Sequence, residues 1–550
     1  MPKRARLVPL LVAFAATALV AAGCGSSGKE GGTVNLIGGT APDSVDPGFG
    51  YTTQALEPDQ VVYTPLVAYA HASGTAGTQL IPGLAKSLPT ISADGKTYTL
   101  QLRPGLKYSN GTPVKASDFT FAIERSIKLP WGGKSFYTGN IVGAADFDSG
   151  KAKSISGITT DDSTGTITIK LTAPFGPFTN VLAYPSSAPI PPSTPIKNEP
   201  TNPPPGDGPF MFAGVSPNTG YTLKKNPNWA AQKIPGIPAG HVDTIDMKIN
   251  ANQTAEAQAV QNNTADVFDP GDVIPPSLVA QIKSAASDRF AAQTTPSTFY
   301  FYMNVKQKPF NSPLVRQAVN YAVDKNALSK LDSGFMKPEC FFIPPEIVGH
   351  PNAPCPYYGS GDPGGSPNLA KAQALVKQSG LAGTPVTVYG QNTDPRDKFV
   401  LYYASVLNQI GLKATPKLIA RPTYFQTIGN AKTPNNQTGF ADWLEDFPHP
   451  TDYYLLLNCA TIQPVNNQNF SQVCDPKIEA QTKALNPVPQ VKLQSVASQW
   501  QALDEYTAKQ AYENVWGEEL LPKFTSNRVN FSTYYLHPVY LADFTSLQLK

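Results

Sequence analysis

A strong net charge is missing from this chain. Three of its 43 Lys and Arg residues lie within the first 23 positions, which hold no acidic residue, so 40 basic and 40 acidic residues remain in the rest. Proteins that bind nucleic acid usually carry a basic footprint, and none is present here. We therefore expect no nucleic-acid partner.

The sequence also lacks the local signatures of common catalytic and metal sites. It contains no G-x-S-x-G, no H-E-x-x-H and no C-x-x-C, and its five histidines are scattered. We therefore expect no enzyme, no cofactor and no metal site. A lipid-anchored hydrolase whose catalytic residues lie far apart in sequence is the alternative from another class of protein.

Long apolar runs are absent beyond the first residues. Three basic residues precede an apolar run at Leu7–Ala22, which is shorter than the ~20 residues that cross a membrane. Ala-Ala-Gly then leads to Cys24, a stretch that resembles the lipobox of bacterial lipoproteins. We predict a signal peptide over 1–23, lipidation of Cys24, and a flexible Gly/Ser-rich tether over 24–32. An ordinary secretory signal is the alternative.

Cysteine is scarce, with five in the chain. Besides Cys24 these are Cys340, Cys355, Cys459 and Cys474. Outside the cytoplasm an even number favours two disulfides, although four cysteines allow three pairings. Each sequence neighbour lies 15 residues away, so Cys340–Cys355 and Cys459–Cys474 is the simplest pairing. Each bridge is worth ~3 kcal/mol in the chain-entropy model.

Strand and helix patterns alternate along the chain. Residues 97–102, 166–171 and 244–249 alternate apolar and polar side chains, which predicts half-buried strands. A helix is predicted from Pro313 with Ser312 as its cap, and another between a cap at Asn368 and a stop at Gly380. A strand at 386–390, a helix and a strand near 413–419 follow in βαβ order, so we predict an α/β fold.

One long segment resembles a known family. Ile81–Ile127 carries the turns Asp-Gly-Lys, Leu-Arg-Pro-Gly and Asn-Gly-Thr-Pro, in an order similar to that of family 5 extracellular solute-binding proteins, the dipeptide and oligopeptide receptors of ABC importers. Further landmarks follow in the family's order at Gly31–Pro47, Gly206–Phe210, Lys224–Trp229 and Phe301–Lys325. The resemblance covers nearly the whole chain after the signal.

The resemblance implies a two-lobed α/β architecture of the periplasmic-binding-protein type II, in the large peptide-binding class with an extra subdomain in lobe one. On this basis we expect lobe one over 33–297, lobe two over 298–519, and a return to lobe one over 520–550. Solute would be enclosed between the lobes, and binding would favour the closed state.

The resemblance also suggests site residues. Phe440–Tyr454 matches a lobe-two loop in which peptide binders use an aspartate to hold the solute's α-ammonium, and Asp446 stands at that place. Trp443 could form an aromatic wall, and Arg396 could bind a peptide carboxylate. Further wall candidates are Tyr51, Asn304 and Tyr424. The alternative for Asp446 is a purely structural role in its loop.

These observations together predict a monomeric receptor on the outer face of a bacterial membrane, anchored by lipid. It would capture peptides and deliver them to the permease of an ABC transporter. The same fold could instead bind an oligosaccharide, a metal chelate or another small solute. A recognition protein at the cell surface that works without a transporter is a third possibility.

Overall fold

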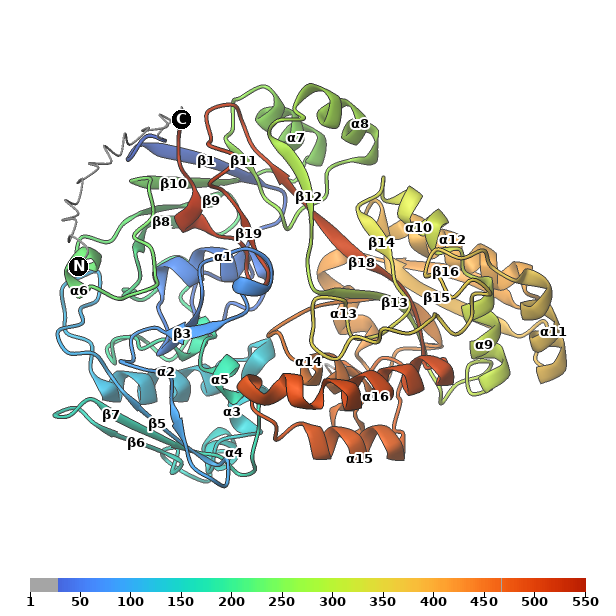
Figure 1. The fold of residues 1–550 in the computed structure, drawn as a ribbon, viewed down its shortest axis with the longest axis horizontal. Helices are drawn as coiled ribbons and strands as arrows, with labels where there is room; N and C mark the ends of the chain where they lie inside the picture. The colour runs from blue at the N-terminus through green and yellow to red at the C-terminus, as the bar shows by residue number, and fades with distance from the viewer. Residues whose placement is uncertain (1–27, 466) are drawn as a thin grey trace, which may run out of the picture.

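The computed structural model describes residues 28–465 and 467–550, which form two lobes joined by two strands (Figure 1). Lobe one is built on a five-stranded sheet in the order β11-β1-β10-β9-β8. Its strands are β1 (Thr33–Gly38), β8 (Phe210–Ser216), β9 (Gly220–Lys225), β10 (Thr244–Ile249) and β11 (Val267–Phe268). β10 has the predicted bounds, and its alternating Ile245 and Met247 are buried.

A second sheet makes a subdomain of lobe one, in the antiparallel order β4-β5-β7-β6. Its strands are β4 (Thr90–Ile91), β5 (Thr97–Gln101), β6 (Ile158–Asp161) and β7 (Thr166–Lys170). Nearby are α2 (Ala116–Lys128), α3 (Ser135–Thr138), α4 (Ala144–Asp148) and α5 (Phe178–Val181). Two of the predicted strands therefore lie side by side here, β5 against β7.

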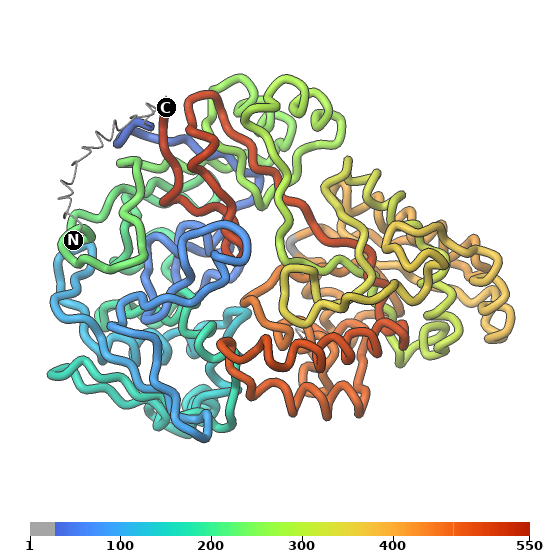
Figure 2. The backbone as a smooth tube through the Cα atoms, viewed as in Figure 1, coloured from blue at the N-terminus to red at the C-terminus, as the bar shows by residue number. Residues whose placement is uncertain are grey.

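The remaining elements of lobe one surround these sheets. The helices are α1 (Thr53–Val62), α6 (Trp229–Gln232), α7 (Gln253–Gln261) and α8 (Pro276–Ala285). Two short antiparallel pairs are β2 (Val67–Tyr69) with β3 (Leu80–Pro82), and β19 (Leu536–His537) with β20 (Leu541–Ala542). The C-terminal segment thus returns to lobe one, and Figure 2 shows it beside the N-terminal strand.

Lobe two is organised around one sheet in the order β12-β18-β13-β17-β15-β16, with β14 paired to β18. Its strands are β12 (Phe290–Thr294), β13 (Ser297–Met303), β14 (Met336–Pro338), β15 (Pro385–Gln391), β16 (Lys413–Ile419), β17 (Thr438–Leu444) and β18 (Glu513–Phe524). β15, α12 and the parallel β16 form the predicted βαβ unit.

Eight helices of the described chain belong to lobe two. They are α9 (Pro313–Ala322), α10 (Lys325–Leu331), α11 (Leu369–Ser379), α12 (Arg396–Gln409), α13 (Arg421–Ile428), α14 (Pro450–Tyr454), α15 (Pro476–Leu485) and α16 (Ala497–Gln510). In α11, Asn368 accepts a hydrogen bond from the backbone N–H of Lys371, and Gly380 ends the helix with φ +69°, as predicted. In α9, Ser312 occupies the cap position, but its side chain makes no capping hydrogen bond, so that detail was wrong.

The two lobes are connected where β12 and β18 run antiparallel, from Phe290 opposite Phe524 to Thr294 opposite Leu520. The other end of β18 pairs with β13 inside lobe two. Phe335 of lobe two contacts the ring of Phe290 at this crossing. The chain therefore passes between the lobes in two neighbouring strands, which is the arrangement of a hinge.

Part of the predicted tether lies in the described chain, and it contacts lobe one. The backbone N–H of Lys29 donates to Leu549 (2.7 Å), and that of Gly31 donates to His241 (2.8 Å). The predicted signal peptide and Cys24 lie outside the described residues. Among the helices that are described, none has the length and apolar character needed to cross a bilayer.

The cysteines pair as Cys340–Cys355 and Cys459–Cys474. Each bridge joins residues 15 apart, so reduction should lower the free energy of unfolding by ~3 kcal/mol per bridge. Urea unfolding with and without a reductant measures this effect. The double variant Cys340→Ser/Cys355→Ser should show about half of the reductive loss. An unchanged urea midpoint under full reduction would contradict the prediction.

Candidate functional site

A cavity of about 390 Å³ lies between the two lobes, a size typical of small-ligand sites. Lobe one contributes the start of α1, the surroundings of α3 and the turn between β19 and β20. Lobe two contributes the end of β17 and the residues after it, α13, and the segments around Leu455 and Phe470. The lining residues are Tyr51, Thr53, Leu56, Gly132, Ser135, Phe136, Thr295, Phe425, Asp442, Trp443, Leu444, Glu445, Asp446, Leu455, Gln468, Phe470, Pro538, Val539 and Leu541.

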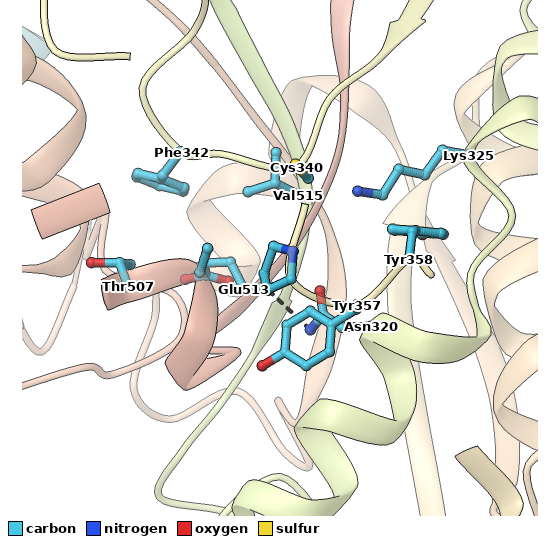
Figure 3. Close-up of a pocket in the computed structure, with 11 residues that line it drawn as sticks. Asn320, Lys325, Cys340, Phe342, Tyr357, Tyr358, Thr507, Glu513 and Val515 are labelled. Carbon is cyan, nitrogen blue, oxygen red and sulfur yellow. Dashed lines mark hydrogen bonds between the residues drawn. The ribbon is translucent and has the colours of Figure 1, made fainter. Parts of the chain in front are cut away.

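A smaller cavity lies inside lobe two, where Figure 3 shows Lys325 and Glu513 among the side chains that surround it. Its volume is about 20 Å³, which is room for about one water molecule. The Lys325 ammonium donates to the carbonyl oxygen of Glu339 (2.7 Å) within the same lobe. This cavity is too small for a peptide, so the cavity between the lobes is the candidate site.

Asp446 and Tyr51 meet across the cavity. The Tyr51 hydroxyl of lobe one donates to a carboxylate oxygen of Asp446 in lobe two, at 2.7 Å. A second contact between the lobes joins the Arg421 guanidinium to the hydroxyl oxygen of Thr40 (3.2 Å). The structure therefore represents a closed arrangement in which Asp446 faces the opposite lobe.

Asp452 holds the Asp446 loop in place. One of its carboxylate oxygens accepts from the backbone N–H of Asp446 and from the indole N–H of Trp443, each at 2.9 Å. Asp452 lies in the first turn of α14, three residues after its cap His449, and the helix fixes its direction. Trp443 and Asp446 are thus oriented by one buried carboxylate, which leaves the Asp446 side chain free to face the cavity.

Burial controls the charge of Asp446. It raises the pKa of this carboxyl to about 7, and the hydrogen bond from Tyr51 partly offsets the rise. Burial, and next the neighbouring Asp446, also raises the pKa of Asp452. A carboxylate in such surroundings binds a cation more strongly than one at the surface, because little solvent screens the pair.

Arg396 lies at the start of α12 but does not line the cavity. Its guanidinium forms an ion pair with Asp442 at 2.7 Å and donates to the Gln391 side chain at 3.2 Å. It also lies over the rings of Phe299 and Phe440. Arg396 therefore neutralises a carboxylate of the cavity wall, and its contact with a peptide carboxylate stays a prediction.

Two other predicted residues lie in the core of lobe two and do not line the cavity. Asn304 is buried, and its side-chain amide donates to the carbonyl oxygen of Asn436 at 3.0 Å. The buried Tyr424 hydroxyl donates to the carbonyl oxygen of Phe440 at 2.6 Å. Of the predicted side chains, the fold thus brings Tyr51, Trp443 and Asp446 together at the cavity.

Several lining residues were missed from the sequence. Phe136 of lobe one and Phe425 and Phe470 of lobe two supply apolar walls, and Glu445 adds a carboxyl beside Asp446. Phe470 lies in the loop that the Cys459–Cys474 bridge closes, which was a usable signal. No three His, Cys, Asp or Glu side chains are grouped to hold a metal within residues 28–465 and 467–550.

Two lobes, two crossing strands and a cavity between the lobes define a solute-binding protein of the type that closes around its ligand. Residues 79–463 match the middle region of the bacterial extracellular solute-binding proteins, family 5. The chain belongs to this family, as its sequence indicated, and the two-lobed α/β fold is confirmed.

This chain is similar in sequence to curated relatives and similar in fold to several solved structures. The glutathione-binding protein GsiB of Escherichia coli O1:K1 is 30% identical over 331 residues, and this match spans 59% of the chain and 58% of GsiB. The clavulanic acid biosynthesis oligopeptide binding protein 2 aligns with a TM-score of 0.83 at 22% identity, over 95% of this chain and 96% of the other. The periplasmic binding protein DppA from Helicobacter pylori, solved with the peptide STSA, aligns with a TM-score of 0.75 at 21% identity, over 95% and 98%.

Proposed function

We propose that this protein is an extracytoplasmic receptor that captures short peptides between its lobes and delivers them to an ABC-transporter permease. The observation that carries the proposal is the Asp446 carboxylate, held at the cavity between the lobes and paired across it with Tyr51. The peptide bound in the similar H. pylori structure and the name of GsiB support a peptide ligand.

The geometry suggests how a peptide is held. Its α-ammonium replaces or joins the Tyr51 hydroxyl at Asp446 and so contacts a residue that already connects the lobes. The apolar side chains of Phe136, Phe425 and Phe470 receive the peptide's side chains. A ligand that touches both lobes stabilises the closed state over the open one. Stacking aromatic walls also suit a sugar, which makes an oligosaccharide the second candidate.

The cellular setting belongs to the same proposal. Cys24 is proposed as the lipidated N-terminal residue of the mature protein, five positions before Lys29, the first residue seen to pair with lobe one. Anchoring would keep the receptor at high local concentration near its permease. The protein is proposed to act as a monomer and without catalysis. Mass spectrometry of solute released from natively purified protein tests the ligand class, since peptides support the proposal and a sugar or chelate contradicts it.

Peptide affinity should depend on pH through Asp446. An ammonium ligand stabilises the carboxylate, so binding below a pKa of about 7 must release a proton. Affinity should therefore fall up to tenfold per pH unit as the pH drops from 7 to 5. Above 7 it should stay level until the peptide amine, with a pKa of about 8, loses its proton.

Calorimetric titrations at pH 5, 6 and 7 check this expectation. Buffers of different ionisation enthalpy then count the protons that are released. Asp446→Asn should remove the slope, because an amide does not titrate in this range. The titratable groups that feel the charge of Asp446 are Tyr51, Tyr69, Tyr184, Asp452 and Glu445, none of which is a cation. A slope of the same size in Asp446→Asn would assign the titration elsewhere.

A further inference from the structure

The cavity between the lobes has an unbalanced charge. Its lining includes three carboxyl groups, on Asp442, Glu445 and Asp446, and no Lys, Arg or His. All three come from the end of β17 and the residues that follow it. Charged groups inside a protein are stable only when they are paired or well hydrogen-bonded, so each of the three needs a partner.

Two of the three carboxyl groups have their partners. Asp442 is paired with Arg396 at 2.7 Å. Asp446 accepts from the Tyr51 hydroxyl, and the proposed function gives it the α-ammonium of a peptide. Within the described chain these contacts leave one carboxyl of the cavity lining without compensation.

That group is the Glu445 carboxyl. Glu445 is only 6% exposed, and neither of its carboxyl oxygens has a hydrogen-bond partner among the described residues. The backbone of Glu445, unlike its side chain, is hydrogen-bonded: its N–H donates to the carbonyl oxygen of Pro296 at 3.3 Å. Glu445 is therefore one of the residues that line the cavity, and both acceptors of its buried carboxyl are unused among the described residues.

The groups around Glu445 increase its need for a cation. The neighbouring charges are further acids, Asp452, Glu346 and Asp446, and together with burial they raise the pKa of the Glu445 carboxyl well above its ordinary value. Lys337, the basic residue near Glu346, is paired with Glu518 at 3.5 Å and is half exposed. A cation that arrives with the solute is what this carboxyl lacks.

We propose that Glu445 binds a second positive charge on the solute, so that the receptor prefers short peptides with a lysine or arginine side chain. This inference rests on the proposed function of the cavity as a peptide site. Asp446 and Glu445 are consecutive, so their Cα atoms are about 3.8 Å apart. Both residues line the same cavity, so one short peptide can present an α-ammonium to Asp446 and a basic side chain to Glu445.

The physical gain comes from pairing a carboxyl that is otherwise buried alone. An uncharged side chain of the same length leaves Glu445 to be buried either as an unpaired anion or in its protonated form. A lysine ammonium supplies charge-assisted hydrogen bonds to this buried carboxyl. The preference is thus expected to disappear when the carboxyl becomes an amide.

Six tripeptides test the inference by calorimetry at pH 7.5. Each carries lysine or the uncharged norleucine at position one, two or three, with alanine elsewhere. At one position or more the lysine peptide should bind the native protein at least tenfold more tightly than its norleucine partner. In Glu445→Gln this ratio should fall to about one, and in Glu445→Asp, which keeps the charge, most of it should return.

The variants distinguish a failure of the role of Glu445 from a failure of the proposed peptide-binding function. Circular dichroism and the urea midpoint of Glu445→Gln show whether this variant keeps the native fold. Asp446→Asn should weaken both members of a pair equally and leave their ratio in place. A ratio near one in the native protein at all three positions, or a ratio that survives Glu445→Gln, overturns the role of Glu445 alone. If none of the six peptides binds the native protein, the proposed function fails and this inference fails with it.

Discussion

Asp446→Asn is expected to weaken the binding of a short peptide at least tenfold at pH 7.5. The substitution preserves the size of the side chain and its ability to accept from Tyr51, but it removes the charge that faces the ligand. A hydrogen bond to a charged group contributes about 1.5–3 kcal/mol, which corresponds to a loss of roughly 10- to 150-fold. Isothermal titration with a tripeptide measures the loss directly.

The same interaction can be removed by changing the ligand instead of the protein. Acetylation of the peptide's N-terminus removes the ammonium, so the native protein should bind the acetylated peptide about as weakly as Asp446→Asn binds the free one. The two losses should not add, because both remove the same interaction. Asp288→Asn serves as the matched control, since Asp288 is an exposed carboxylate before β12. Additive losses, or a comparable loss in the control, would contradict the assigned role.

Much of the local structure could be predicted because it depends on local patterns. The alternation in residues 244–249 fixes which side chains of β10 are buried. Asn368 and Gly380 mark the ends of α11, because one side chain caps the first turn and one glycine adopts positive φ. Ser312 shows the limit of such reasoning, since position alone does not ensure a capping hydrogen bond.

The contacts of the site depend on tertiary structure instead. Tyr51 and Asp446 are 395 residues apart, and only the closure of the lobes brings them together. The resemblance proposed both residues but gave no reason to pair them. Arg396 looked available for a ligand, because the sequence does not show that the register of the sheet places Asp442 beside it. Glu445 is conspicuous only once its burial and its missing partners are known.

Asp46→Ala is expected to lower the free energy of unfolding by about 3–5 kcal/mol, the typical cost of leaving one partner of a buried ion pair alone. Asp46 and Arg125 are both fully buried, and Arg125 nitrogens contact both carboxylate oxygens of Asp46, at 2.7 and 2.5 Å. The carbonyl oxygens of Pro195 and Lys197 still accept from Arg125 but carry no charge. Urea unfolding followed by circular dichroism measures the loss.

The partly exposed pair of Lys134 and Asp148, 2.7 Å apart, provides the contrast. Asp148→Ala should cost at most about 1 kcal/mol, because solvent screens a surface pair and side-chain entropy opposes it. Equal losses of unfolding free energy in Asp46→Ala and Asp148→Ala would show that the buried pair contributes no more to stability than the partly exposed one.

The double variant Asp46→Leu/Arg125→Met separates the penalty of an unpaired charge from the strength of the pair itself. It removes both charges and keeps apolar volume, so it should recover much of the stability that Asp46→Ala loses. The pair also bears on the site, because Asp46 lies in the loop that leads to Tyr51, where Asp43 accepts from the Tyr51 backbone N–H at 3.1 Å. If the double variant is stable but binds peptide weakly, the ion pair serves to position Tyr51. If it is stable and binds normally, Asp43 alone is sufficient to hold that loop against Asp446.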